Sequence, residues 1–482
     1  MNRTHRTGRV CCVCCALVGS WLGQAAFAQT YKLIDLGPCE AQDINNSGQV
    51  IGSELAPSGL HRAFLWQAGV KTELGYLAAD PNETRFSYAQ AINDNGQVVG
   101  TADTDGDGPL HAFLWQTGVM ADLGALCGTT SFAYDINNAG QVIGRCGPDF
   151  GPQQAFLWQD GVATDLGGLP GYTESWPTAI NGAGQVAGYS ALPDQPARVF
   201  LWDDGVVTDL GAPNDLLSTP TAIGEGGIVI GFLLTADETP VSFLWFGGFF
   251  INMSGFLPTG AIIEDLNETC TLVGNIDYWH DPFLVEPFLE SADGQAAARG
   301  TDLQDVLTDL TYGWPVFPLQ DLIDPNLDVE LRTARAVNDA GRIVGRMLNH
   351  ATDKLHGYVL MPIHPDQQYT LTLAVATDPP QQPLGYIQAD PPGPEYAEGD
   401  EVELHAVAGI GSTFVRWEVH DVAHAGDPNY AVISADNPLT IVMDADRQVT
   451  AVFECAFGGG LGPPLLGILL PISCLGIWRR LR

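Results

Sequence analysis

The feature that most constrains this chain is a repeat of about 44 residues that opens with the pattern Ile-Asn-x-x-Gly-Gln-Val-x-Gly. Close copies begin at Ile44, Ile92, Ile136 and Ile180, and weaker copies begin at Ile223, Leu266 and Val337. Five of the six steps between the closing glycines are 43 to 48 residues long. A fixed period of this length indicates a repeat architecture, in which each unit is one supersecondary element.

Each unit predicts four short strands. Asn-x-x-Gly suits the tight turn of a hairpin, because both residue types tolerate positive φ, and Gln-Val-x-Gly begins the return strand. A third strand reads Ala-Phe-Leu-Trp, as at Ala63–Trp66, and a fourth reads Val-x-x-Asp-Leu-Gly, as at Val119–Gly124. The third strand is apolar on both faces, which is typical of a strand covered on both sides. We therefore predict an all-β fold made of the four-stranded blades of a β-propeller.

The two ends of the repeat region predict how the propeller closes. Tyr31–Gly37 reads as a fourth strand with no unit before it, and the seventh unit stops at His356–Leu360 without a fourth strand. Sharing strands between the first and last blades removes the exposed sheet edges that an open stack would leave. We expect residues 29–362 to form a seven-bladed propeller closed by its N-terminal strand, with six and eight blades as the alternatives.

The repeat resembles the HAF family of bacterial extracellular repeats, over residues 31–362. The resemblance rests on Ile-Asn-x-x-Gly-Gln-Val-x-Gly followed by His-Ala-Phe-Leu-Trp, as at Ile92–Gly100 and His111–Trp115. It implies an exported or envelope protein and no particular reaction. The sixth unit departs from the pattern, since Cys270 replaces the turn glycine and Phe288-Leu289-Glu290 lacks the tryptophan.

The amino-terminal segment predicts export. A basic stretch ends at Arg9, an apolar run begins at Val10, and Ala26-Phe27-Ala28 has the small-x-small pattern that signal peptidase needs. We predict a signal peptide over residues 1–28 with processing after Ala28.

A second, small all-β domain is expected over residues 369–454, from alternating stretches such as Tyr369–Leu373. Tyr396–Asp400 and Met443–Phe453 resemble the divergent internalin-type bacterial repeat. That resemblance implies a spacer or adhesive module on a bacterial surface. An insertion at Asp421–Tyr430 departs from the compact form of that repeat.

Residues 455–482 predict a hydrophobic sorting or anchor tail. Leu461–Trp478 carries no charge and forms the expected terminal transmembrane helix, and arginines at 479, 480 and 482 favour a cytoplasmic end. The plan resembles C-terminal tails processed by exosortase- or rhomboid-type enzymes, which implies a sorting protease as partner and either Cys455 or the glycines at 458–460 as the processing point. A simple membrane anchor is the alternative. Either way, we expect the protein on the outer surface of the envelope or outside the cell, with the tail at least transiently in the inner membrane.

Three groups of residues are candidate sites. Asp103, Asp105 and Asp107 have the carboxylate spacing of a calcium loop, but position twelve is not a glutamate, so an exposed acidic turn is the alternative. Calcium is the one cofactor that the sequence suggests. Tyr312, Trp314 and Phe317 lie in the extra length between the sixth and seventh units and are the candidate ligand-binding loop. A loop that covers one end of the propeller is the alternative. Cys127 and Cys146 flank one predicted hairpin and are the candidate disulfide.

Composition and motifs narrow the function. A formal net charge of −37 opposes binding to phosphate backbones, so nucleic acid is excluded as an expected partner. The chain has no nucleophile elbow, phosphate loop or dinucleotide fingerprint. We expect a non-catalytic envelope or extracellular binding or adhesion scaffold that recognises a glycan or envelope protein through propeller loops. A structural surface or matrix component is one alternative, and a propeller hydrolase with its active site in the channel is another.

Overall fold

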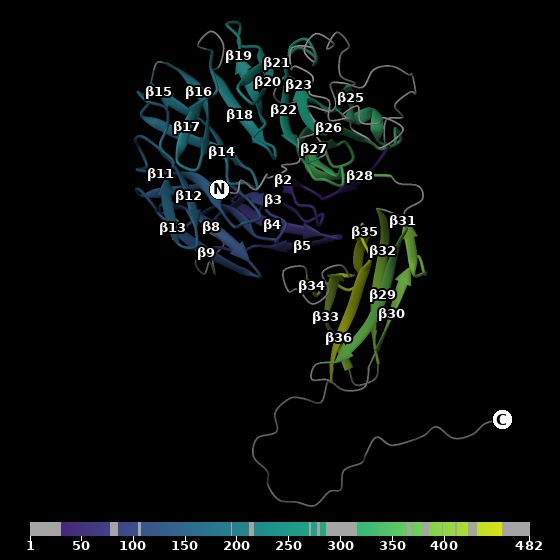
Figure 1. The fold of residues 1–482 in the computed structure, drawn as a ribbon. Helices are drawn as coiled ribbons and strands as arrows, with labels where there is room; N and C mark the ends of the chain where they lie inside the picture. The colour runs from purple at the N-terminus through teal and green to yellow at the C-terminus, as the bar shows by residue number, and fades with distance from the viewer. Residues whose placement is uncertain are drawn as a thin grey trace, which may run out of the picture.

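The computed structural model describes residues 30–455, except 78–84, 105–107, 194, 212–215, 269–270, 277–279, 286–315, 364–367, 378–384, 398, 410–411 and 423–430. Within these ranges the chain is almost entirely strands and turns, with a short 3-10 helix at Leu319–Leu322 (Figure 1). None of the described segments is a helix long and apolar enough to cross a membrane. The predicted signal peptide and the apolar tail segment lie outside the described residues.

The repeats fold into four-stranded antiparallel sheets, seven of them in the described part of the chain. Six consist of four consecutive strands, and we number them sheets 1 to 6. Sheet 1 contains β2 (Cys39–Ile44), β3 (Val50–Leu55), β4 (His61–Gln67) and β5 (Val70–Glu73). Sheet 2 contains β6 (Ser87–Ile92), β7 (Val98–Asp103), β8 (Leu110–Gln116) and β9 (Val119–Gly124). Sheet 3 contains β10 (Thr130–Ile136), β11 (Val142–Gly147), β12 (Gln154–Gln159) and β13 (Val162–Asp165). Sheet 4 contains β14 (Glu174–Ile180), β15 (Val186–Leu192), β16 (Gln195–Asp203) and β17 (Val206–Asp209). Sheet 5 contains β18 (Ser218–Ile223), β19 (Val229–Leu234), β20 (Pro240–Phe246) and β21 (Phe249–Asn252). Sheet 6 contains β22 (Ala261–Leu266), β23 (Leu272–Ile276), β24 (His280–Val285) and β25 (Val316–Pro318).

Sheet 7 combines the two ends of the repeat region. Its strand order is β1 (Tyr31–Asp35), β28 (Lys354–Pro362), β27 (Ile343–Asn349) and β26 (Val329–Val337). β1 runs antiparallel to β28, with Tyr31 opposite Pro362 and Asp35 opposite Tyr358. The N-terminal strand therefore lies at the outer edge of the last unit's sheet, which is where the sequence predicted it.

The closing glycine of each repeat is required by close packing inside the sheet. A Cβ on Gly52 would lie 1.9 Å from the carbonyl oxygen of Glu40, because a β-bulge brings the first strand close at this point. Phe64 stands opposite Gly52 on the third strand, and its ring fills the space that a side chain would occupy. The same fully buried ring recurs in the other sheets at Phe113, Phe156, Phe200, Phe243, Phe283 and Tyr358. Glycine and aromatic ring are thus one packing unit repeated around the fold.

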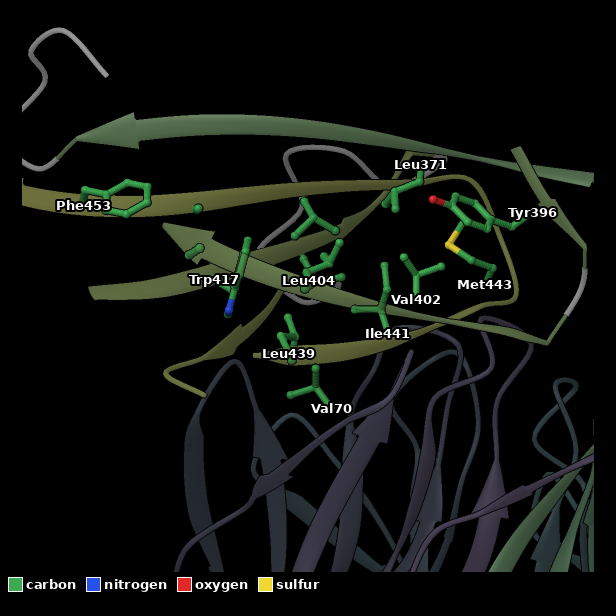
Figure 2. Packing of buried hydrophobic residues seen from close by; sticks show 14 residues of the cluster. Val70, Leu371, Tyr396, Val402, Leu404, Trp417, Leu439, Ile441, Met443 and Phe453 are labelled. Atoms are coloured by element: carbon green, nitrogen blue, oxygen red, sulfur yellow. The ribbon is translucent and has the colours of Figure 1, made fainter. Parts of the chain in front are cut away.

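The C-terminal domain contains two sheets. One has the order β31 (Glu395–Ala397), β29 (Gln368–Thr377), β36 (Arg447–Cys455), β33 (Ser412–Asp421) and β34 (Ala431–Ser434), and the other has the order β30 (Gly385–Asp390), β32 (Asp400–Ala408) and β35 (Leu439–Met443). Trp417, Met443 and Phe453 are fully buried in its core (Figure 2).

The two domains are packed against each other. Val70, at the hairpin between β4 and β5, belongs to the core cluster of the C-terminal domain and lies beside Leu439 (Figure 2). The backbone N–H of Val442 donates to the carbonyl oxygen of Ala68 at 3.0 Å. The C-terminal domain therefore continues the hydrophobic core of sheet 1.

Candidate binding site on the propeller axis

The turns that follow the first strands line one cavity of about 260 Å³. Each of the seven units contributes the same three positions: the aliphatic residue that ends the first strand, the next residue, which is asparagine in six units, and the residue after it. Since all seven units reach this cavity, it lies on the common axis of the sheets. We call it the axial cavity.

The repeated asparagine joins each turn to the next one. Asn45 Nδ2 donates to Gln49 Oε1 in its own turn at 2.7 Å and to the carbonyl oxygen of Asn93 in the next turn at 3.0 Å. Equivalent inter-turn bonds run from Asn93 to Asn137, from Asn137 to Asn181, from Asn181 to Gly224, from Asn267 to Asn338 and from Asn338 to Asn45. The sequence predicted a role in turn geometry alone for this asparagine, and the inter-turn bond was not predicted. Its recurrence four residues before glutamine was the signal.

The residue after the asparagine position forms the rim of the axial cavity. These rim residues are Asn46, Asp94, Asn138, Gly182, Glu225, Glu268 and Asp339. Three of the four carboxylates accept a backbone N–H from a neighbouring turn, as Asp94 does from Asn46 at 2.9 Å and Glu225 does from Gly182 at 2.6 Å. Among the described residues that line the cavity there is no lysine, arginine, histidine, serine or cysteine. The rim therefore combines carboxylates, which accept hydrogen bonds and attract positive charge, with amides, which both donate and accept.

Three further aspartates, Asp43, Asp135 and Asp265, directly precede the aliphatic residue in sheets 1, 3 and 6. Asp135 accepts the N–H of Ile136 at 2.7 Å and that of Ile180, in the next sheet, at 2.8 Å. Protein surrounds these carboxyls, and desolvation raises the pKa of Asp43 to about 6 and the pKa of Asp135 and Asp265 to about 7. Repulsion among the three raises the pKa of Asp135 and Asp265 further. The axis thus carries acidic groups that gain charge near neutral pH.

Only one of the three predicted calcium ligands lies within the described residues. Asp103 is the last residue of β7, is buried, and accepts the N–H of Phe86 at 3.3 Å. Asp105 and Asp107 lie outside the described residues. In the ranges that the structure describes, no group of three metal-ligating side chains comes together. Calcium binding stays a prediction.

Phe317 does not lie in a loop, contrary to the expectation for the ligand-binding segment. It is the middle residue of β25, the outer strand of sheet 6, opposite Leu284. Its half-buried side chain packs against the core formed with Leu319 and Leu322. Val316–Pro318 takes the place of the Asp-Leu-Gly strand of other units, and the longer spacing concealed this equivalence. Tyr312 and Trp314 lie outside the described residues.

Cys127 and Cys146 are joined by a disulfide in the structure, with Cα atoms 5.5 Å apart. Cys146 is buried in β11, and Cys127 precedes β10. Cys455 is the last residue of β36 and stands opposite Ser412. Ala28 lies outside the described residues, so neither processing point is tested.

The described residues define a β-propeller with a bacterial repeat domain packed against it. Residues 384–456 match the family model described as the divergent InlB B-repeat domain, in agreement with the resemblance found in the sequence. The HAF resemblance stays a prediction. No curated protein matches the chain.

Several solved structures are similar to the chain. TolB from Acinetobacter baumannii is 14% identical, with 46% of this chain and 54% of that chain covered and a TM-score of 0.32. YCF48 bound to D1 peptide is 10% identical, with 70% and 99% covered and a TM-score of 0.38. The SapL1 lectin in complex with alpha methyl fucoside is 10% identical, with 69% and 98% covered and a TM-score of 0.32. This chain therefore spans about half of TolB, and no functional conclusion follows from these similarities.

Proposed function

We propose that this protein is a non-catalytic binding scaffold of the bacterial cell envelope that recognises a glycan through the axial cavity. One observation carries the proposal: all seven units line one cavity whose rim holds four carboxylates and two amides, and the described lining residues include no cation and no nucleophile. Sugar hydroxyls and amines are hydrogen-bond donors and match such a surface. A volume of about 260 Å³ is at the small end of ligand pockets and suits one sugar unit.

The proposal includes a closed ring of seven blades, which gives the cavity a continuous wall. Two contacts support closure. β1 pairs with β28, so residues from both ends of the repeat region share sheet 7. Asn338 Nδ2 donates to the carbonyl oxygen of Asn45 at 3.0 Å, which links the last turn to the first.

The cellular address in the proposal rests on the sequence. The signal peptide at residues 1–28, the HAF resemblance and the tail at residues 455–482 all favour export to the outer surface, with processing of the tail by a sorting protease. Cell fractionation with an antibody against the propeller tests this part. Recovery in the cytoplasmic fraction contradicts it.

Glycan binding is tested with the purified protein by isothermal titration against glucose, N-acetylglucosamine and glucosamine. We expect binding of at least one of these sugars, with the amine preferred because the rim is acidic. The double substitution Glu225→Gln and Glu268→Gln removes two charges and keeps an acceptor oxygen on each side chain. It should weaken the binding about tenfold, because the amide oxygens still accept hydrogen bonds but each bond loses the part of its strength that comes from the charge.

The matched control is Asp160→Asn, which removes one charge at an exposed hairpin turn that does not line the cavity. It should leave the affinity unchanged. Failure of all three sugars to bind, or equal affinity for the wild type and the double variant, contradicts the proposed site.

A further inference from the structure

Arg145 and Arg346 occupy the same position of the repeat, directly after the closing glycine, but they meet different partners. Arg346 reaches across to sheet 1, where its Nη1 lies 3.1 Å from Glu40 Oε1. In sheet 4 the position equivalent to Glu40 is Trp176, because each residue stands one place before the residue opposite the closing glycine. Arg346 therefore faces the carboxylate of Glu40, whereas Arg145 faces the indole of Trp176.

Arg145 lies in a row of planar groups between sheets 3 and 4. Its guanidinium carbon is 4.0 Å from the ring centroid of Trp176 and 4.4 Å from that of Phe132. The rings of Trp176 and Tyr189 are stacked, with centroids 5.9 Å apart and planes 10° apart. All four side chains keep part of their surface accessible. Cation–π contacts engage the faces of the guanidinium, so its terminal Nη groups can still donate hydrogen bonds in the plane of the group.

The charge of Arg145 is not neutralised within the described residues. Its Nε is buried and has no hydrogen-bond partner, its side chain is hydrogen-bonded to Tyr134, and it takes part in none of the ion pairs found among the described residues. Eight other arginines pair with a carboxylate: Arg62, Arg198, Arg332, Arg335, Arg342, Arg346, Arg416 and Arg447. In a chain with 57 acidic residues, Arg145 therefore differs from these eight arginines and can pair with an external anion.

We propose that Arg145 binds the carboxylate of an acidic sugar, in a second site that the sequence did not indicate. A carboxylate matches the planar N–H edge of a guanidinium with two parallel hydrogen bonds. The phenols of Tyr134 and Tyr189 lie close enough for the Arg145 charge to act on both, and they supply hydroxyl groups for the hydroxyls of a sugar ring. Burial raises the pKa of Tyr134 to about 12, so this phenol stays protonated at neutral pH. This site uses other residues than the axial cavity and takes the opposite charge, so it stands independently of the proposed function.

The test is titration of the purified protein with glucuronate and with glucose, which differ by the carboxylate. We expect glucuronate to bind at least tenfold more tightly than glucose. Arg145→Gln should weaken glucuronate binding at least tenfold, since it removes the charge and the two-pronged donor. Arg145→Lys should restore only part of the affinity, because an ammonium cannot form the parallel pair.

The matched control is Arg346→Gln, which removes the same charge from the same repeat position and should leave glucuronate binding unchanged. Two results overturn the proposal. One is equal glucuronate binding by the wild type and by Arg145→Gln, when the variant melts at the wild-type temperature. The other is a wild-type protein that does not bind glucuronate. Preference for a short acidic peptide over glucuronate also overturns it. The Glu225→Gln and Glu268→Gln variant separates the two proposals, because it should retain glucuronate binding even if the axial cavity binds no sugar.

Discussion

The same hairpin position is covered in sheet 1 and bare in the next three sheets. Val70 is 6% exposed, whereas Val119, Val162 and Val206 are 62 to 66% exposed. The sequence around these positions differs little, since each follows a Gly turn between the third and fourth strands. The difference is the C-terminal domain, whose strand β35 covers the hairpin of sheet 1. The bare valines of the other sheets therefore show how exposed this position is when no second domain contacts it.

A polar position gives the same comparison. Gln49, Gln97 and Gln141 each donate to a glutamine at the end of the third strand in their own sheet. The seventh unit has Arg342 instead, and its Nη1 lies 3.1 Å from Asp444 Oδ2 in the C-terminal domain. Asp444 is fully buried and also pairs with Arg447. The departure from glutamine therefore marks where the second domain is anchored.

The largest effect is expected from Asp444→Asn. The substitution leaves Arg342 and Arg447 buried with a neutral partner, and removing one member of a buried ion pair costs about 3 to 5 kcal/mol. Urea unfolding followed by tryptophan fluorescence should show this loss in the free energy of unfolding. A loss below about 1 kcal/mol would mean that the network does not anchor the domain.

The next effect tests the hydrophobic contact directly, by placing the same change on the covered and the bare hairpin. Val70→Asp should lower the free energy of unfolding by about 3 kcal/mol, because it removes a buried aliphatic side chain and buries a charge. Val162→Asp, at the bare position, should change it by less than about 0.5 kcal/mol. Thermal unfolding of both variants provides the measurement. Equal effects would contradict the domain contact.

The smallest effect contrasts Asp444, which has cationic partners, with Asp135, which has neighbouring acids. The pKa of Asp135 is raised in the folded protein, so the folded state binds more protons than the unfolded state between about pH 4 and pH 7. Stability from Asp43, Asp135 and Asp265 should therefore rise as pH falls through 7 and be lost as pH rises. We expect Tm to increase between pH 8 and pH 5, and Asp135→Asn should reduce that increase. A wild-type slope in the opposite direction would count against this account of the axis.

The sequence predicted the strands within each unit, which follow from the repeat period, and missed the side-chain contacts between units. Four strands per unit and the role of Tyr31–Gly37 followed from spacing and alternation, which are local signals. The inter-turn bond of Asn45, the contact between Arg342 and Asp444 and the aromatic environment of Arg145 each join residues from different units or domains. In the sequence, each contact is marked only by one departure from the repeat pattern or by one recurrent residue. Such a mark can be interpreted only when the residues of the neighbouring sheet or domain are known. Phe317 was assigned to a loop because its strand follows an irregular spacing.

The central claim is that β1 completes the sheet of the last unit, and a cysteine cross-link tests it most directly. Leu33 and Leu360 stand opposite each other in β1 and β28. In a variant with Leu33→Cys and Leu360→Cys, mild oxidation should join the two strands, and peptide mass mapping after proteolysis should recover the linked pair. Moving the second cysteine to Leu114, in the third strand of sheet 2, should give no link. Failure of the matched pair to form while the protein remains folded would contradict the closed arrangement.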